Sequence, residues 1–87
     1  MPPSLAYQVV LARRVGEQLR DAPPELRGFV AGVVALLRTD PSVGTAAFLV
    51  IRDPEYNTIV FPDGRGFLGY HVVEERRLVV LVDLAWP

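Results

Sequence analysis

The clearest pattern in the sequence is an apolar stripe of helical period that begins at Pro24. Its apolar residues recur three and four positions apart, which places them on one face of a helix. Pro24 suits the first helical position, Glu25 lies favourably against the helix dipole, and Asp40-Pro41 ends the helix. We therefore predict an amphipathic helix whose apolar face packs on a sheet. That face consists of Leu26, Phe29, Val30, Val33, Val34 and Leu37.

The opposite face of this helix carries two glycines, Gly28 and Gly32. Each costs about 1 kcal/mol of helix stability relative to alanine. Either another backbone approaches closely there, or the helix is simply exposed and weak on that side. The sequence leaves both explanations open.

Before this helix, the period of the apolar residues changes from two to four. The alternating stretch predicts a first strand, and the four-residue repeat predicts a short amphipathic helix. Pro23 and Pro24 end that helix, because proline lacks the backbone donor. The strand positions are Leu5, Tyr7, Val9 and Leu11, and the helix positions are Leu11, Val15 and Leu19.

After residue 46 the period shifts toward two, and turn residues arrive at strand-length intervals. We predict strands at 48–52, 58–61, 67–73 and 78–86, the last two forming a hairpin around Glu74–Arg77. Pro62-Asp63-Gly64 is a turn, in which glycine supplies the positive φ. Residues 78–82 are apolar on both faces, which predicts a central strand covered on both sides.

The predicted fold class is α+β, in one domain over residues 1–87. Two amino-terminal helices pack on one face of a carboxy-terminal antiparallel sheet, to which the amino-terminal strand is added at a position that the sequence leaves open. Eighty-seven residues suffice for one apolar core. The hydrophobic fraction of 51% is high for this length, so we expect apolar surface that a second copy or another partner covers.

Composition also excludes some kinds of chemistry. The chain has no cysteine, which rules out disulfides, thiolate metal sites and cysteine nucleophiles. The one histidine cannot anchor a metal by itself, and no carboxylates show metal-ligand spacing. We therefore expect neither a metal nor a cofactor.

Charge and hydropathy limit the kinds of partner and the cellular location that the sequence predicts. Nine basic residues, all arginine, stand against ten acidic ones, whereas a dedicated nucleic-acid binder usually has a basic excess. No apolar run approaches the roughly 18 residues that span a membrane, and no signal peptide is visible at the amino terminus. We expect a cytoplasmic protein without a membrane contact.

The order of the predicted elements, together with three stretches of sequence, resembles the RelE/ParE toxins of bacterial type II toxin-antitoxin systems. The first stretch is Asp-Ala-Pro-Pro-Glu-Leu-Arg at 21–27, and the second is Ala-Leu-Leu-Arg-Thr-Asp-Pro at 35–41. The third is the closing hairpin at 69–80, which begins Gly-Tyr-His-Val-Val-Glu-Glu. The resemblance covers nearly the whole chain and lies in the ordered combination, since no single motif is diagnostic.

The resemblance implies a toxin that a cognate antitoxin neutralises. RelE-like members cut mRNA on the ribosome, and ParE-like members act on DNA gyrase. The nucleases work without metal, through Lys and Arg on the concave face of the sheet, often with a Tyr or His near the carboxyl terminus. If Tyr70 is the family's hairpin tyrosine, the lysine-bearing strand becomes residues 58–61, which carry no charge. At the position where the family has an arginine, this sequence has Phe67 or Leu68, and the nearest basic residue is Arg65.

Four side chains remain as catalytic candidates: Arg65, His71, Tyr70 and Arg52. Cleavage of RNA without metal needs a proton acceptor, a cation for the phosphorane and a proton donor. His71 could be a general base near neutral pH, although we favour a partly buried, hydrogen-bonded histidine. Arg65, between two glycines, could meet a phosphate, and the alternative is a solvated turn arginine.

Three further residues are candidates for contact with a partner. Arg13 and Arg14 could form a basic side of the first helix, but Glu17 nearby favours an ordinary solvated surface. Trp86 either closes the core or contacts an antitoxin.

The leading hypothesis is a RelE/ParE-like toxin that acts by binding a macromolecular target, with the usual ribonuclease residues largely missing. One alternative is a catalytically silent protein-interaction module of the same fold. Another is a divergent metal-free endoribonuclease that uses Arg65 and His71 on RNA or the ribosome. A homodimer and a cognate antitoxin are the expected protein partners.

Overall fold

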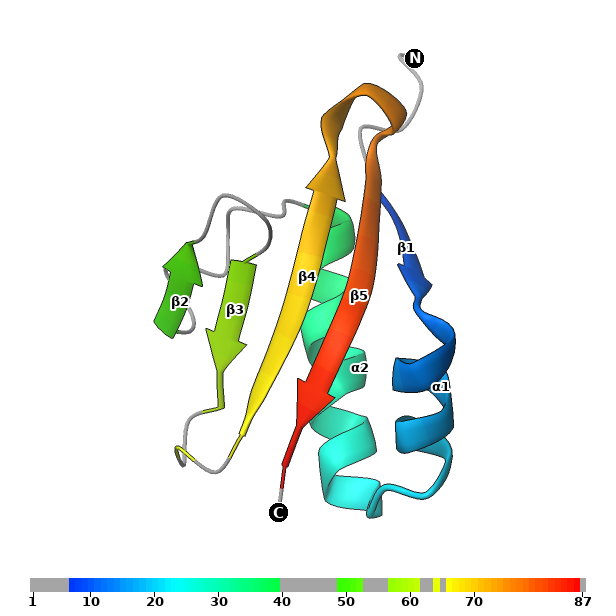
Figure 1. The fold of residues 1–87 in the computed structure, drawn as a ribbon, viewed down its shortest axis with the longest axis vertical. Helices are drawn as coiled ribbons and strands as arrows, with labels where there is room; N and C mark the ends of the chain where they lie inside the picture. Colours follow the sequence, from blue (N-terminus) through cyan, green and yellow to red (C-terminus); the bar gives the residue numbers. More distant parts are fainter. Residues whose placement is uncertain (1–6, 40–48, 53–56, 62–63, 65, 87) are drawn as a thin grey trace.

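A computed structural model describes residues 7–39, 49–52, 57–61, 64 and 66–86 of the chain (Figure 1). Two helices and five strands follow one another in the predicted order, which confirms the α+β fold class. The elements are β1 (Gln8–Leu11), α1 (Arg13–Arg20), α2 (Pro24–Thr39), β2 (Leu49–Arg52), β3 (Asn57–Val60), β4 (Phe67–Val73), a 3-10 turn (Glu74–Arg76) and β5 (Leu78–Ala85).

The five strands form one sheet in the order β1-β5-β4-β3-β2. Strands β2 to β5 pair antiparallel, as predicted. Strand β1 joins the sheet at its edge and runs parallel to β5, with Gln8 opposite Leu78. The chain can make this parallel pairing because both helices and the other three strands lie between β1 and β5, far more than a crossover requires.

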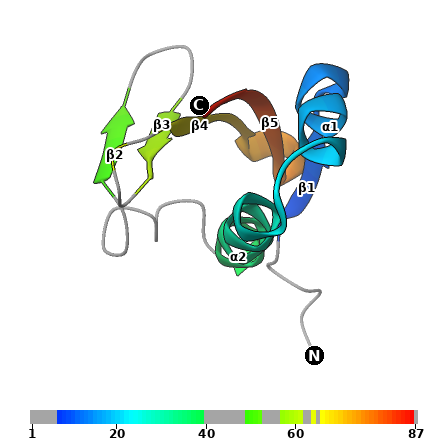
Figure 2. The same cartoon turned by 90° about the horizontal axis from the view of Figure 1, so that it is seen from below.

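Helix α2 lies against one face of the sheet, behind β4 and β5 (Figures 1 and 2). Its predicted apolar face is confirmed. Val30, Val33 and Leu37 are buried in the core, while Leu26, Phe29 and Val34 are half-buried and pack against it. The ring of Phe29 meets Phe61 edge to face at 4.8 Å between centroids, which joins the helix to the end of β3.

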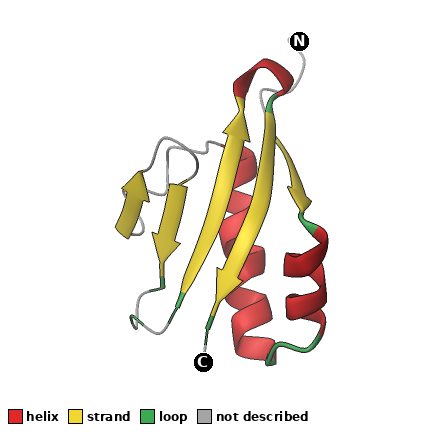
Figure 3. Ribbon diagram, in the orientation of Figure 1, coloured by secondary structure: helices red, strands yellow, loops and turns green. Residues whose placement is uncertain are grey.

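Helix α1 lies along the edge of β5, beyond the point where β1 ends (Figure 3). The backbone N–H of Ala12 donates to the carbonyl of Leu81 at 2.8 Å. Six residues further along the chain, the side-chain amide of Gln18 donates to the carbonyl of Leu84 at 2.7 Å. These two donors bind carbonyls of β5 from the side of β1, the first at the end of β1 and the second beyond it. Val15, also on α1, is fully buried in the shared core.

Strand β5 is central, as predicted, because β1 and β4 pair with its two edges. The prediction that both of its faces are covered is wrong. Val79 and Leu81 are fully buried, but Val80 and Val82 are half-buried on the opposite face. Among the described residues α2 covers only one side of the sheet, so the second apolar face of this strand stays partly open to water.

The turn that the sequence predicts at residues 62–64 can be compared with the structure at Gly64. Gly64 has a φ of 72°, and its N–H donates to the carbonyl of Phe61 at 2.8 Å, so the positive φ predicted there is confirmed. The other two residues of this turn, 62 and 63, lie outside the described residues. No described atom comes within 4 Å of a Cβ built on Gly28 or Gly32, which supports the explanation of an exposed, weak helix face.

Candidate functional site: the outer face of the sheet

The outer face of the sheet is the side away from α2, and its residues follow from the strand register. Ile59 and Leu68 pair with each other and are fully buried against the helices. Their neighbours along each strand therefore point to the other side. The register places Gly69 and, opposite it, Asp83 of β5 on the outer face. The other residues of this face include Ile51, Thr58, Val60, Phe67, His71, Val80 and Ala85.

This face carries a shallow, open hollow near the paired ends of β3, β4 and β5. Among the described residues of its lining, Thr58 has the only hydrogen-bonding side chain and none is ionisable. These residues can make apolar contacts, but they offer neither a proton acceptor nor a cation for phosphate chemistry. The hollow is lined by Ile51, Thr58, Val60, Gly64, Gly66, Phe67 and Ala85.

His71 lies on the outer face, opposite Val80 of β5. Its side chain is exposed, so the predicted partly buried histidine is wrong in that respect. The reason is that the described elements cover only the other side of the sheet. The hollow described above does not include His71 in its lining.

Tyr70 lies on the opposite side of the sheet from His71. It is fully buried in the core, and its neighbour across the sheet is Leu81 of β5. A register shift between Gly69 and Tyr70 leaves this alternation in place up to the hairpin. The structure therefore separates these two catalytic candidates instead of bringing them together on one face.

The two remaining catalytic candidates cannot be placed as side chains. Arg52 lies in β2 with its backbone opposite Asn57, but its side chain lies outside the described residues. Arg65 lies outside them entirely. The described residues thus bring no two of the four candidates together.

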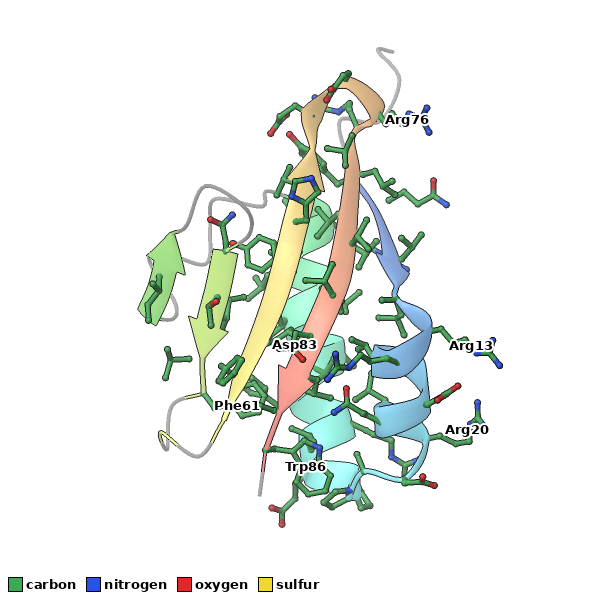
Figure 4. The ribbon with its side chains drawn as sticks, viewed as in Figure 1. Arg13, Arg20, Phe61, Arg76, Asp83 and Trp86 are labelled. Atoms are coloured by element: carbon green, nitrogen blue, oxygen red, sulfur yellow. The ribbon has the colours of Figure 1, made fainter. Side chains whose placement is uncertain are left out.

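The arginines of α1 have local acidic neighbours. The Nε of Arg13 lies 3.2 Å from a carboxylate oxygen of Glu17, and the Arg13 side chain is 93% exposed and points away from the body of the protein (Figure 4). Arg14 reaches a carboxylate oxygen of Asp83 at 3.8 Å. Both contacts fit a solvated surface. Each of the two arginines has a carboxylate nearby, so the pair does not form a basic patch.

Trp86 is half-buried and packs against the core cluster next to the end of β5, near the base of α2 (Figure 4). The explanation that it closes the core therefore has structural support. Part of its side chain is exposed, and a contact between Trp86 and a partner stays a prediction.

Sequence reasoning missed a cluster that joins β1 to the tip of the β4–β5 hairpin. The hydroxyl of Tyr7 donates to a carboxylate oxygen of Glu74 at 2.7 Å, and the guanidinium of Arg77 lies 4.6 Å from the centre of the Tyr7 ring. Arg77 adopts a left-handed φ of 49° at the end of the 3-10 turn. These residues are about 70 positions apart in sequence, so no local pattern could have connected them.

The described residues contain no group of three or more His, Cys, Asp or Glu side chains that could hold a metal ion. None of the helices in the described part of the chain is long and apolar enough to cross a membrane.

The parallel amino-terminal strand beside the last strand, the two helices and the antiparallel meander of this chain form a RelE-like fold. Among solved structures, the chain is similar to the RelE–RelB complex from the archaeon Pyrococcus horikoshii OT3, with a TM-score of 0.75 and 18% identity over 93% of this chain and 94% of that one. It is also similar to an arginine-to-alanine mutant of the E. coli toxin RelE in the free state, with a TM-score of 0.73 and 17% identity over 93% and 83%. No protein-family model and no curated relative matches the sequence.

Proposed function

We propose that this protein is the toxin of a toxin-antitoxin pair and that it acts by binding a macromolecular target, not by cutting RNA. The RelE-like fold supports the first half of the proposal. One observation supports the second half: none of the described residues that line the hollow on the outer face of the sheet is ionisable.

The absence of charge in the hollow bears directly on catalysis. RNA cleavage without metal builds negative charge on a phosphorane, and enzymes of this kind stabilise it with preorganised donors or cations. Loss of one such contact commonly costs about 3 to 4 kcal/mol of barrier, or two to three decades in rate. Among the candidates whose side chains the structure describes, only His71 lies on the outer face, and one histidine cannot act at once as base, acid and phosphate cation. Loss of several contacts is therefore expected to silence the chemistry.

The proposed partner is a cognate antitoxin. One of the similar solved structures is of a RelE bound to RelB, and 51% hydrophobic residues in 87 give this chain apolar surface to bury. We further propose that the pair is cytoplasmic, because macromolecular targets such as the ribosome or gyrase are found there.

A catalytically silent interaction module is the second candidate, and the same uncharged hollow favours it. Such a module would bind another protein without harm to the cell. Toxicity therefore separates the two functions.

The test is tightly controlled expression in a bacterial host. The toxin proposal predicts growth arrest on induction, and it predicts rescue by co-expression of a short neighbouring reading frame with a DNA-binding half and a disordered tail. Normal growth at high levels of folded protein, checked by circular dichroism of the purified chain, would favour the silent module.

A further inference from the structure

We propose that β1 opens from the sheet independently of the rest of the molecule, and that a cluster around Tyr7 holds it closed. We call this cluster the Tyr7 clasp and define it by Tyr7, Glu74 and Arg77. The proposal does not depend on the function proposed above.

Strand β1 has little apolar burial of its own. None of its four residues is buried, whereas β3, β4 and β5 each bury at least one residue. It pairs with a single neighbour, β5, over those four residues at the edge of the sheet (Figure 1). Segments with few buried apolar contacts open at a lower free energy than the core does. The position of β1 therefore depends strongly on the contacts at its two ends.

The Tyr7 clasp holds the first end of β1 against the hairpin tip and α2. The hydroxyl of Tyr7 donates to a carboxylate oxygen of Glu74 at 2.7 Å. Its backbone N–H donates to the carbonyl of Arg38, in the last turn of α2, at 2.6 Å. The next N–H, that of Gln8, donates to the carbonyl of Arg77 at 2.9 Å. Tyr7 thus connects β1 with two parts of the fold that are distant in sequence.

Arg77 has a backbone conformation that favours glycine. Its φ of 49° and ψ of 51° lie in the left-handed region, where a side chain costs conformational energy. Its guanidinium lies 4.6 Å from the centre of the Tyr7 ring, within the range of a cation–π contact. An arginine at this position therefore offsets its conformational cost by a contact with β1 that glycine could not make.

The second end of β1 forms the hinge of the proposed opening, at Ala12. The N–H of Ala12 donates to the carbonyl of Leu81 at 2.8 Å. Helix α1 follows directly, and its Val15 is fully buried in the core. These contacts keep α1 in place while β1 is open. The opening exposes the edge of β5 from Leu78 to Val80, which pairs with β1 in the closed state.

Native-state hydrogen exchange of the full-length protein, followed by NMR, tests the proposal. We expect the Gln8 amide to exchange by a local opening, at a rate that changes little in low urea because little surface is exposed. The amides of β4, which lies between β3 and β5, should exchange only by unfolding of the whole molecule, and therefore faster as urea is added. An equally steep dependence on urea at Gln8 would overturn the proposal.

Tyr7→Phe tests the clasp, because it removes the hydroxyl and keeps the ring. We expect exchange at Gln8 to become about 3 to 10 times faster, the effect of one lost hydrogen bond. The matched control is Gln18→Ala, which removes a hydrogen bond of α1 beyond the hinge. That bond stays intact when β1 opens, so the control should accelerate exchange in β4 and leave Gln8 unchanged. An unchanged rate at Gln8 in Tyr7→Phe, or equal acceleration of Gln8 and β4 in Gln18→Ala, would contradict the proposal.

Arg77→Gly keeps the proposal testable if Tyr7→Phe fails to fold by circular dichroism. It removes the cation from the clasp and gives the turn the residue that its left-handed φ favours. We expect exchange at Gln8 to become about 2 to 5 times faster, the effect of a lost cation–π contact. Exchange in β4 should accelerate less, because the relieved backbone offsets the lost contact. If Gln8 exchanges no faster than in the native protein, the clasp does not hold β1 and the proposal is wrong.

Discussion

At the scale of single residues, Gly66 shows how closely the start of β4 approaches the end of β5. A Cβ at this position would collide with the carbonyl oxygen of Ala85 and would lie 3.0 Å from the Cα of Trp86. Both obstacles are backbone atoms, which cannot move aside as the end of a flexible side chain can. At Gly28, in contrast, a Cβ would meet nothing within 4 Å.

We therefore expect Gly66→Ala to lower the free energy of unfolding by about 1 to 3 kcal/mol, the usual effect of overpacking. The control, Gly28→Ala, lies on an exposed helix surface and should raise it by about 1 kcal/mol. Urea denaturation of both variants measures the difference. Equal effects in the two variants would contradict the close approach.

Gln18 gives a second prediction at this scale, because its amide binds the carbonyl of Leu84 in a partly buried position. Gln18→Ala removes this donor and should cost about 1 kcal/mol in the free energy of unfolding. Arg13→Ala, which removes an exposed ion pair of the same helix, should cost about 0.5 kcal/mol or less. The same urea titration tests the pair, and a larger loss at Arg13 would argue against the role of Gln18 at the edge of β5.

At the scale of elements, the helical period of α2 gives two adjacent leucines very different exposure to solvent. Leu37 is 1% exposed and Leu36 is 37% exposed. Leu37→Ala should cost about 2 to 5 kcal/mol in the free energy of unfolding, because it opens a cavity in the core. Leu36→Ala should cost about 0.5 kcal/mol or less, as surface substitutions usually do. Thermal and urea unfolding measure both, and similar losses would mean that α2 is rotated from the position described.

The helices and the closing hairpin could be predicted because their signals are local: a period of four or two, prolines at the ends, and a short turn. The position of β1 could not, since its pairing of Gln8 with Leu78 joins distant parts of the chain. The apolar run at 78–82 predicted a central strand, but it could not show that Val80 and Val82 remain half-buried.

The candidate site was predictable in part for the same reasons. The absence of charge from residues 58–61 is visible in the sequence, and it matches the uncharged hollow found on the outer face. Strand alternation predicts that His71 shares a face with Phe67, Gly69 and Val73, opposite to that of Tyr70, and the structure has Tyr70 buried and His71 exposed. Which face the helices cover is set by packing across the whole molecule, so the exposure of His71 required the structure.

At the scale of the whole molecule, the exposed arginines lie on the two helices and at the tip of the β4–β5 hairpin, whereas none of the described residues that line the hollow is ionisable. A target that binds in the hollow should therefore be held mainly by apolar contacts, and its binding should depend little on ionic strength, since salt screens charges and not apolar contacts.

We propose that this RelE-like fold binds its target without cutting RNA, and mapping of transcript ends in cells that express the protein tests the proposal. Native protein, Arg65→Ala and His71→Ala are compared at matched expression levels. We expect growth arrest by the native protein with no new transcript ends at codon-defined positions. Codon-positioned cleavage by the native protein, abolished by both substitutions, would contradict the proposal and establish a ribonuclease that uses Arg65 and His71.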